Sequence, residues 1–418
     1  MSLNHHFLAK ATTDSVLAKF KSGEWKCCGN AGLNFYRVGC ESGFPSPDAA
    51  FYDNEEELMV CFEFKPPTEN KRGILTGLGQ SIAYLKSSNI SFLVIPKKLE
   101  NFELGTYMTE LYDTLIRDTI PIGLIIYDND NVGDVQLVHN VAPLAHKKDF
   151  TPTGNQRFWA KHQDLPIPLF HLLLHCYYLK KVGVISGDAF SYCWNKYLFP
   201  KKAVDDLTPM EVKDTSGVPI NTLSDRKKIL FGEKKIKKIH TLVGTAKTTA
   251  IEKLEKDIDS TFVGDNYYNS IKKNFVTFLK HIGMIDSTGD MTEEGFKLYH
   301  LGLTNGPRSR LFEDYFIKTV LTIGHQLELI FDIDILCNEY RGKKDTKEII
   351  KIMHKEYEEK GMIKSNPGRT VGKESTVGFL KYEFILWNSC GLTVKTNGKP
   401  GISFNWKKIT EICSLPSL

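Results

Sequence analysis

The sequence predicts an α/β domain followed by mainly helical domains, and three observations support this. Between residues 48 and 140, short apolar runs alternate with amphipathic segments, which is typical of a mixed sheet flanked by helices. After Pro143 the strand-like runs give way to helical periodicity. At 418 residues the chain exceeds the ~250–300 residues at which single cores stop growing. We therefore expect more than one domain.

Four segments follow from these changes along the chain. The α/β domain covers 1–150, a helical connector with a basic run covers 151–245, and two winged-helix-like modules cover 246–340 and 341–418. Each module is predicted from a helix followed by a tight polar turn, and in the second module the turn contains Asn397-Gly398, a strong hairpin signal. The winged-helix likeness rests on this order of elements.

The elements of the first domain follow from hydrophobic period. Runs at 49–53 and 58–65 flank a polar turn, which predicts a hairpin, and further buried strands are expected at 91–95 and 122–127. A helix over 74–86 is expected to bury one apolar face, which contains Leu75, Leu78, Ile82 and Leu85. A second helix over 107–117 is expected to bury Met108, Leu111 and Leu115.

The later helices show apolar residues at helical spacing. A helix over 168–181 carries Leu169, Leu172, Leu173 and Leu174. Another contains Tyr268, Ile271, Phe275, Phe278, Leu279 and Ile282. A helix over 377–390 precedes strand-like runs at 392–395 and 402–406, as expected for the second winged-helix-like module.

Charge is distributed unevenly along the chain. Residues 1–150 hold 14 Lys and Arg against 19 Asp and Glu, whereas the remainder holds 40 against 31. This asymmetry favours a polyanionic partner held by the later domains, although an ordinary solvated surface has similar charge. With no apolar run of 18 residues and no signal-peptide pattern, the sequence predicts a soluble intracellular protein with no membrane partner.

The nine cysteines are scattered and form no C-x-x-C pair, so we expect reduced core thiols. Cys27, Cys28 and Cys40 are close enough in sequence to suggest an iron–sulfur cluster, but adjacent cysteines are awkward ligands and no fourth ligand is obvious. Structural use is the favoured interpretation.

Three charged residues converge if the predicted hairpin forms. When Asp53 faces Leu58 across the turn, Asp48 faces Glu63, with Cβ atoms ~4.5–5.5 Å apart. Lys65 follows Glu63 by two residues and so points to the same face of the sheet. The alternative, Asp53, lies on the opposite face and ~17 Å along the strand. The plainer interpretation is that Asp48 and Glu63 only flank strands, but a carboxylate ending a buried run needs a partner.

Two carboxylates at this distance repel one another unless a proton or a cation lies between them. Their oxygen atoms favour Mg²⁺, for which Mn²⁺ would substitute, and the expected ligands are the carboxylates of Asp48 and Glu63. Such a cation can activate water and neutralise charge on a phosphodiester, and Lys65 can orient the water and contact the phosphate. The sequence therefore predicts metal-dependent phosphodiester hydrolysis.

The spacing of these residues resembles the signature of the PD-(D/E)xK nuclease superfamily. Pro47-Asp48 precedes Glu63-x-Lys65 by fourteen residues, and Gln80 and Tyr84 resemble the Q-x-x-x-Y element of RecB-like members. The resemblance covers about residues 45–127 and implies a restriction-endonuclease-like core. It implies a catalytic role for Asp48, Glu63, Lys65 and Gln80, with Phe64 as a further metal ligand and Tyr84 contacting DNA. An acidic residue that usually precedes the hairpin has only doubtful candidates, Glu24 and Glu41.

A nuclease domain followed by basic modules is similar to a type II restriction endonuclease. This implies a cytoplasmic enzyme of a bacterium or archaeon that cleaves double-stranded DNA at or near a specific sequence, giving 5′-phosphate and 3′-hydroxyl ends, with a cognate DNA methyltransferase as functional partner. A homodimer would suit this activity, because paired cuts need two active sites or two visits. The candidate DNA contacts outside the core are Arg308, Arg310, Arg341, Lys343, Lys344, Arg369, Lys373, Lys395 and Lys399.

Two alternatives remain open. The first is a modification-dependent or structure-specific repair nuclease. The second is a winged-helix DNA-binding protein whose nuclease domain is inert, against which the three intact residues argue. The sequence shows neither a G-x-x-x-x-G-K-[ST] phosphate loop nor a G-x-S-x-G nucleophile motif.

Overall fold

The computed structural model describes residues 3–26, 32–38, 47–116, 119–144, 158–161, 166–198, 212–220, 238–262, 266–286, 288–359, 362–363, 379–394 and 402–418. The chain forms two compact units. Unit 1 comprises residues 1–160, 320–381 and 391–415, and unit 2 comprises residues 161–319, 382–390 and 416–418. The expected boundary at 150 lies near the first change of unit, whereas those at 245 and 340 do not coincide with one.

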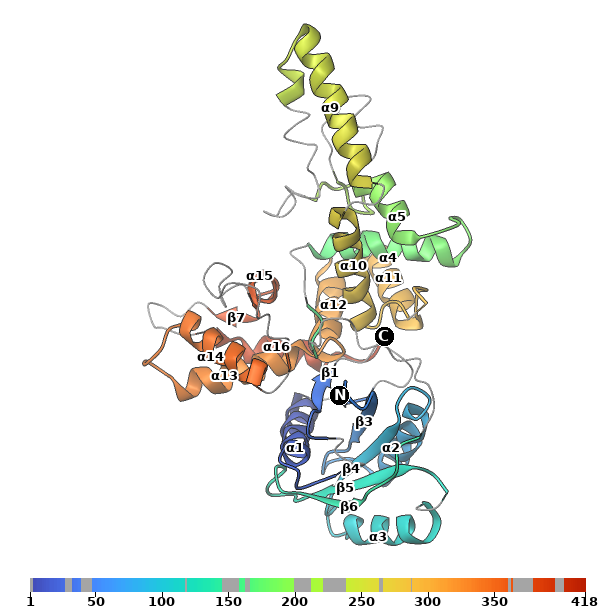
Figure 1. The fold of residues 1–418 in the computed structure, drawn as a ribbon, viewed down its shortest axis with the longest axis vertical. Helices are drawn as coiled ribbons and strands as arrows, with labels where there is room; N and C mark the ends of the chain where they lie inside the picture. The colour runs from blue at the N-terminus through green and yellow to red at the C-terminus, as the bar shows by residue number, and fades with distance from the viewer. Residues whose placement is uncertain are drawn as a thin grey trace. The chain divides into compact units, whose positions relative to one another are not determined.

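Unit 1 contains a six-stranded mixed sheet, which confirms the expected α/β layout (Figure 1). Its order follows the chain: β1 (Tyr36–Val38), β2 (Ala49–Asp53), β3 (Leu58–Phe64), β4 (Ile90–Pro96), β5 (Ile122–Tyr127) and β6 (Val135–His139). The β3–β4 and β4–β5 pairs are parallel, and the other pairs are antiparallel. Strands β1 and β6 were not predicted.

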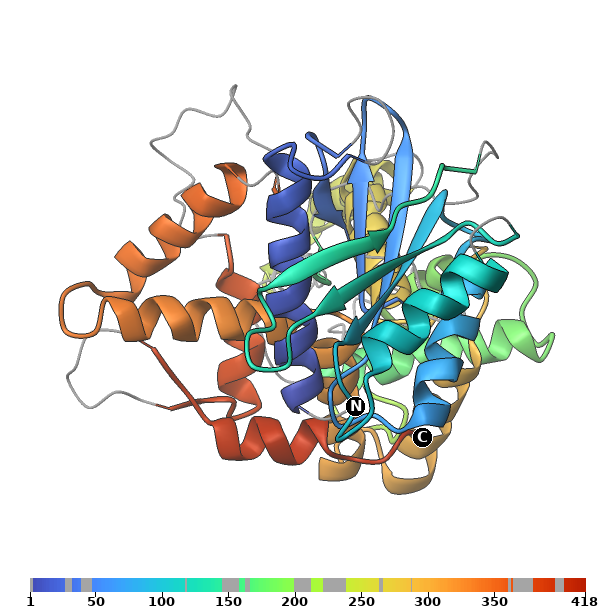
Figure 2. The same ribbon diagram turned by 90° about the horizontal axis from the view of Figure 1, so that it is seen from below.

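Helices cover both faces of this sheet (Figure 2). On one face, α1 (Leu3–Lys21) places Phe20 against Phe92 of β4, with the ring centroids 6.3 Å apart. On the other, α2 (Lys71–Tyr84) and α3 (Leu104–Leu111) pack on a core of buried aliphatic side chains that includes Leu93 and Ile95. The sheet is therefore buried on both sides, which explains the nearly continuous apolar runs of its central strands.

The predicted core faces of the two helices were partly wrong. In α2, Leu75 and Ile82 are 58% and 42% exposed, and the buried residues are Ile74, Gly77, Ser81 and Tyr84. Gly77 faces the sheet there because the long side chain of Lys65, the residue after β3, fills the space beside it. Leu115 is 66% exposed because a π-helical turn, η1 (Tyr112–Ile116), follows α3 and shifts the helical period, turning Tyr112 and Ile116 inward.

The rest of unit 1 is mainly helical. It contains α13 (Gln326–Glu339), α14 (Thr346–Glu359), the two-stranded hairpin of β7 (Thr393–Val394) and β8 (Ser403–Phe404), and α16 (Trp406–Cys413). Helix α13 packs against α1, with the rings of Phe331 and Phe7 5.3 Å apart. The predicted strand-like runs at 392–395 and 402–406 therefore form a hairpin, although the turn between them lies outside the described residues.

Unit 2 is helical in its described parts. It contains α4 (Ile167–Lys181), α5 (Ala189–Cys193), the π-helix η2 (Trp194–Leu198), α9 (Gly244–Phe262), α10 (Asn266–His281), α11 (Glu293–Asn305) and most of α12 (Arg310–Thr322) and α15 (Lys381–Ser389).

Two of the helices in unit 2 match the prediction closely. All four predicted leucines of α4 are buried, as are the residues of α10 and its end from Phe275 to Ile282 that were expected in the core. An antiparallel bridge between Ile285 and Met291 closes the turn that precedes α11. Nowhere in the described part of the chain is a helix both long enough and apolar enough to span a membrane.

Candidate active site

The β2–β3 hairpin has the predicted register and brings Asp48 to Glu63. Asp53 pairs with Leu58 and Ala49 pairs with Phe62. Asp48 directly precedes β2, and its backbone N–H donates to the Phe62 carbonyl at 3.0 Å. Its side chain acts as the hydrogen-bond partner of the Phe64 backbone, because Oδ2 accepts from the Phe64 N–H at 2.8 Å. The carboxylate of Asp48 is therefore fixed beside the end of β3, where Glu63 lies.

Lys65 forms the centre of a polar group on the α2 face of the sheet. Its Nζ lies 2.8 Å from Oε1 of Glu63 and donates to Oε1 of Gln80 at 3.2 Å. Hydrogen bonds to its backbone hold Lys65 in place. Its N–H donates to the Val94 carbonyl at 2.9 Å, and its carbonyl accepts from the Tyr127 hydroxyl at 2.8 Å. The structure thus brings together Glu63, Lys65 and Gln80, as the sequence predicted.

Tyr84 contributes to the site from α2, one helical turn after Gln80. Its hydroxyl donates to Oε2 of Glu63, and its ring is buried. Glu63 therefore receives one hydrogen bond on each carboxylate oxygen, from Lys65 and from Tyr84. The predicted role of Tyr84 as a DNA contact needs a different description: its hydroxyl orients a carboxylate inside the protein.

Gly77 explains how Lys65 fits under α2. A Cβ atom at position 77 would lie 2.3 Å from Cε of Lys65 and 3.1 Å from Cδ1 of Leu93. Any larger residue would push the lysine stem away from Glu63. The small face of α2, which helical periodicity failed to identify, is therefore the surface that admits the charged side chain.

Asp53, the alternative to Asp48, has a local role in the hairpin turn. Its Oδ1 accepts from the N–H groups of Glu55 and Glu56, at 2.9 and 3.3 Å. This is an Asx-type turn, the usual use of aspartate at such positions. The geometry agrees with the choice of Asp48.

His5 was not predicted, yet it contacts the site. Its Nε2 lies 3.1 Å from Oδ1 of Asp48, and its ring packs edge-on against Phe64, with centroids 5.4 Å apart. His5 belongs to the first turn of α1, which is far from the hairpin in sequence. The periodicity of apolar residues along one segment therefore could not predict this contact. The doublet His5-His6 lies more than 40 residues before Asp48, so nothing in the sequence linked the two.

The two carboxylates have opposite shifts in pKa. Burial, followed by the charge of Asp48, raises the pKa of Glu63 to about 7, against the opposing effect of Lys65. Burial would also raise the pKa of Asp48, but the hydrogen bond and charge of His5, with the N–H of Phe64, lower it overall. Burial and the neighbouring His5 lower the pKa of His6 to about 4.

The donor set fits a hard divalent cation that keeps most of its water. Within the described ranges, no three or more His, Cys, Asp and Glu side chains are grouped to hold a metal. Magnesium commonly takes only one or two protein carboxylates together with substrate phosphate, so Asp48 and Glu63 suffice. Glu24 does not supply the expected upstream acid, since it pairs with Lys19 on the surface, and Glu41 lies outside the described residues.

The predicted metal ligand Phe64 has its side chain in the core. Its ring stacks on Tyr127, with centroids 5.2 Å apart, and its N–H binds Asp48. Only its backbone carbonyl could therefore act as a ligand. Phe64 lies between Glu63 and Lys65 in the chain, so it stays adjacent to the site.

Among the candidate DNA contacts, the described residues have different surroundings. Arg308 is used within unit 2: its Nε lies 2.6 Å from Oδ2 of Asp214, and Nη2 donates to the Pro219 carbonyl at 2.7 Å. Arg310 is exposed and pairs with Asp314. Arg341, Lys343 and Lys344 lie together at the turn between α13 and α14. Four candidates lie outside the described residues: Arg369, Lys373, Lys395 and Lys399.

Six of the nine cysteines are described and all are free thiols, which agrees with the expected structural use. Five are buried, and Cys337 is half-buried. Cys27, Cys28 and Cys40, on which the iron–sulfur idea depended, lie outside the described residues.

Neither the protein-family models nor the curated proteins match this chain, so its site has to be interpreted from its own geometry.

Proposed function

We propose that the protein is a metal-dependent endodeoxyribonuclease of the PD-(D/E)xK type that cleaves duplex DNA at or near a specific sequence. The observation that carries the proposal is the convergence of Asp48, Glu63 and Lys65 at the end of one hairpin, with Lys65 Nζ 2.8 Å from Glu63. With a divalent cation held between them, two buried carboxylates beside an ammonium group would suit a phosphodiester, which brings negative charge and needs a positive environment during attack.

Asp48 and Glu63 would hold the cation, and the cation would activate the attacking water and neutralise charge on the phosphate. His5 and the Phe64 N–H fix the orientation of Asp48. Tyr84 fixes Glu63. Lys65, held by Gln80, is a compact positive group that can shift from Glu63 to the scissile phosphate.

The sequence-specific part of the proposal depends on the helical regions. In unit 1, α13, α14 and the β7–β8 hairpin offer elements for a winged-helix-like module, and in unit 2 the bridged turn before α11 resembles the start of a wing. Arg341, Lys343 and Lys344 at the α13–α14 turn are the described candidates for phosphate contact. Their positive charge supports binding to a polyanion.

The test is digestion of unmethylated plasmid DNA with the full chain. We expect discrete fragments with 5′-phosphate ends in Mg²⁺ or Mn²⁺ and none in EDTA. Glu63→Gln and Lys65→Ala should abolish cleavage while binding to DNA in EDTA persists, and Lys86→Ala, an exposed lysine after α2, should cleave normally. Full activity in both site variants would refute the site.

Other outcomes would select an alternative function. Cleavage restricted to methylated or branched DNA would favour the modification-dependent or structure-specific nuclease. Binding without cleavage under every metal condition would favour the DNA-binding protein with an inert nuclease domain.

A further inference from the structure

Helix α1 is held on one side by the candidate active site. In its first turn, His5 contacts the Asp48 carboxylate at 3.1 Å and packs against the ring of Phe64. The position of His5 therefore depends on how α1 is rotated about its axis and how far it is advanced along that axis. A helix packed only through apolar side chains is free to adjust both by small amounts, since dispersion contacts have little directionality.

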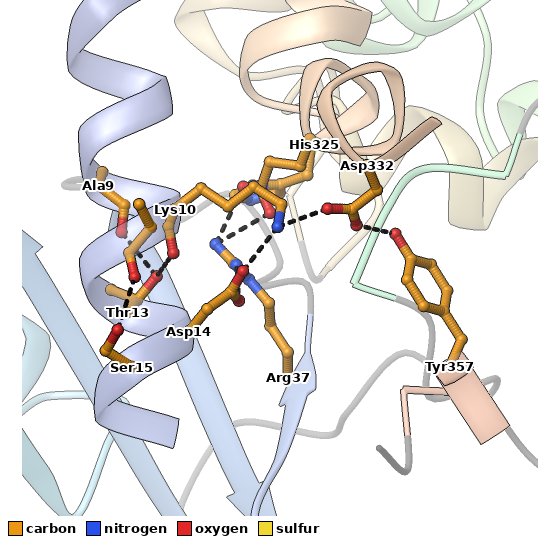
Figure 3. Close-up of polar contacts among 11 residues, drawn as sticks. Ala9, Lys10, Thr13, Asp14, Ser15, Arg37, His325, Asp332 and Tyr357 are labelled. Atoms are coloured by element: carbon orange, nitrogen blue, oxygen red, sulfur yellow. Dashed lines mark hydrogen bonds and ion pairs between the residues drawn. The ribbon is translucent and has the colours of Figure 1, made fainter. Parts of the chain in front are cut away.

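On another side, α1 is held by a buried group of charged residues, which Figure 3 shows. We call this group the ion cluster; it comprises Lys10, Asp14, Arg37, His325, Glu328, Asp332 and Tyr357. Because each helical residue turns the chain by about 100°, Lys10 lies about 140° around the helix from His5, whereas Lys10 and Asp14 share one face. The contacts of His5 and those of the ion cluster therefore hold α1 on different sides.

Lys10 connects α1 directly to α13. Its Nζ lies 2.6 Å from Oδ2 of Asp14 and 2.7 Å from Oδ1 of Asp332. Asp332 also accepts a hydrogen bond from the Tyr357 hydroxyl of α14, so three helices meet at one carboxylate (Figure 3). The side chain of Lys10 is only 10% exposed, and this contact is therefore shielded from solvent.

Arg37 of β1 connects the sheet to the same helix, α13. Its Nη2 lies 3.0 Å from both carboxylate oxygens of Glu328, and its guanidinium carbon lies 5.4 Å from the centre of the Phe158 ring. His325, at the start of α13, contacts Glu328 at 3.0 Å. Arg37 and Glu328 are both buried. Through these ion pairs, α13 has directional contacts with both α1 and the sheet.

We infer that the ion cluster fixes the rotation and axial position of α1, and thereby places His5 against Asp48. Lys10, Arg37, Glu328 and Asp332 are then positioning residues for the proposed cleavage, on which this inference rests. Directional ion pairs suit this role because a shift of about 1 Å at a catalytic group can lower a rate about 10²-fold. An apolar contact between the same helices would bind them without setting the register.

The test removes the Lys10–Asp332 pair as a unit, in the variant Lys10→Met/Asp332→Leu. Replacing both partners avoids leaving a lone charge buried between α1 and α13. The matched control is Lys355→Met/Glu359→Leu, an exposed ion pair on α14 with atoms 3.5 Å apart. Tyr357→Phe is a milder variant that loosens Asp332 by one hydrogen bond and serves if the double variant does not fold.

Two measurements separate positioning from a merely structural role. The first is the NMR signal of the His5 ring in metal-free protein at fixed pH, identified by its loss in His5→Gln. We expect it to move in the Lys10/Asp332 variant and not in the control. The second is cleavage: kcat should fall at least about 10-fold while KM changes less than about 2-fold.

A double-mutant cycle with His5→Gln completes the test. If the ion cluster acts through His5, then the Lys10/Asp332 substitutions should lower kcat little further once His5 is replaced. An unmoved His5 signal, or full additivity of the two losses, would overturn the inference. A wild-type protein without nuclease activity would refute the proposed function instead, and the His5 signal would still decide the positioning of α1.

Discussion

Unit 1 contains two groups of buried charges, and they differ in how those charges are matched. In the ion cluster, Glu328 faces Arg37, Asp332 faces Lys10, and the remaining carboxylate, Asp14, has a side chain 38% exposed. At the candidate active site, Glu63 faces Lys65. In the part of the chain that the structure describes, the ion pairs of Asp48 involve only His5.

The pKa values of the two glutamates follow this difference, although burial and the neighbouring Asp14 raise the pKa of Asp332 in the ion cluster against the effect of Lys10. Burial would raise the pKa of Glu328, but Arg37 and His325 lower it to about 2. Burial and the neighbouring Asp48 instead raise the pKa of Glu63 to about 7. A group with matched charges stabilises one arrangement of helices, whereas a group with a surplus carboxylate is stabilised by an added positive charge. The charge that each side chain faces therefore separates Glu328 of the ion cluster from Glu63 of the candidate active site.

Removing one partner of an ion pair in the ion cluster should have the largest effect on stability. Arg37→Met leaves Glu328 buried without its cation, and removal of one partner from a buried pair costs about 3–5 kcal/mol. We expect a loss of this size in the free energy of unfolding measured in urea. Lys65→Met should cost less, because the raised pKa of Glu63 lets that carboxyl take up a proton. Equal losses would remove the distinction between the two groups.

Substitution of a carboxylate in the candidate active site should affect catalysis most. Asp48→Asn is expected to lower kcat by about 10²–10³-fold, the usual cost of losing one group that stabilises charge in the transition state. Asp53→Asn is the matched control, with the same change five residues along the chain in a turn-forming side chain. The measurement is the initial rate of plasmid cleavage in Mg²⁺. Similar losses in both variants would indicate that the hairpin, and not the Asp48 carboxylate, matters.

A dependence on pH sharpens the comparison further. The pKa of Glu328 is lowered from 4.5 to about 2, so between these values the unfolded chain binds more protons than the folded one. Stability from this group is therefore complete above pH 4.5 and is lost as pH falls toward 2, by about 3 kcal/mol in total. In urea unfolding at several pH values, Glu328→Gln should flatten this decline. An unchanged profile would show that Glu328 is not depressed.

The sequence predicted the part of the site that depends on local geometry. Strand period and the turn at Asp53 set the hairpin register, and this register placed Asp48 near Glu63 and Lys65 on the same face. Helical period failed at α2, because the exposed Leu75 and Ile82 form a more regular apolar stripe than the buried Gly77 and Ser81. At Gly77 the space that the Lys65 side chain needs, and not hydrophobicity, decided which residue turned inward.

Contacts between distant parts of the chain could not be predicted in this way. Helix α1 was missed because its buried face includes Lys10, Thr12 and Thr13, which disguise its amphipathic period. With α1 missed, the contact between His5 and Asp48 could not be anticipated. The packing of α13 on α1 was missed as well, since Arg37 and Glu328 look like ordinary surface charges until the fold brings them together.

The Arg37–Glu328 contact also has a consequence for synthesis on the ribosome. Its partners are 291 residues apart, and at about 5–20 residues per second the second one follows the first by roughly 15–60 s. During that interval the nascent sheet and α1 lack the partners of Arg37 and Lys10. The contacts that hold α1 and β1 to α13 are thus completed late, after all of the intervening chain has been made, and truncated products would lack them.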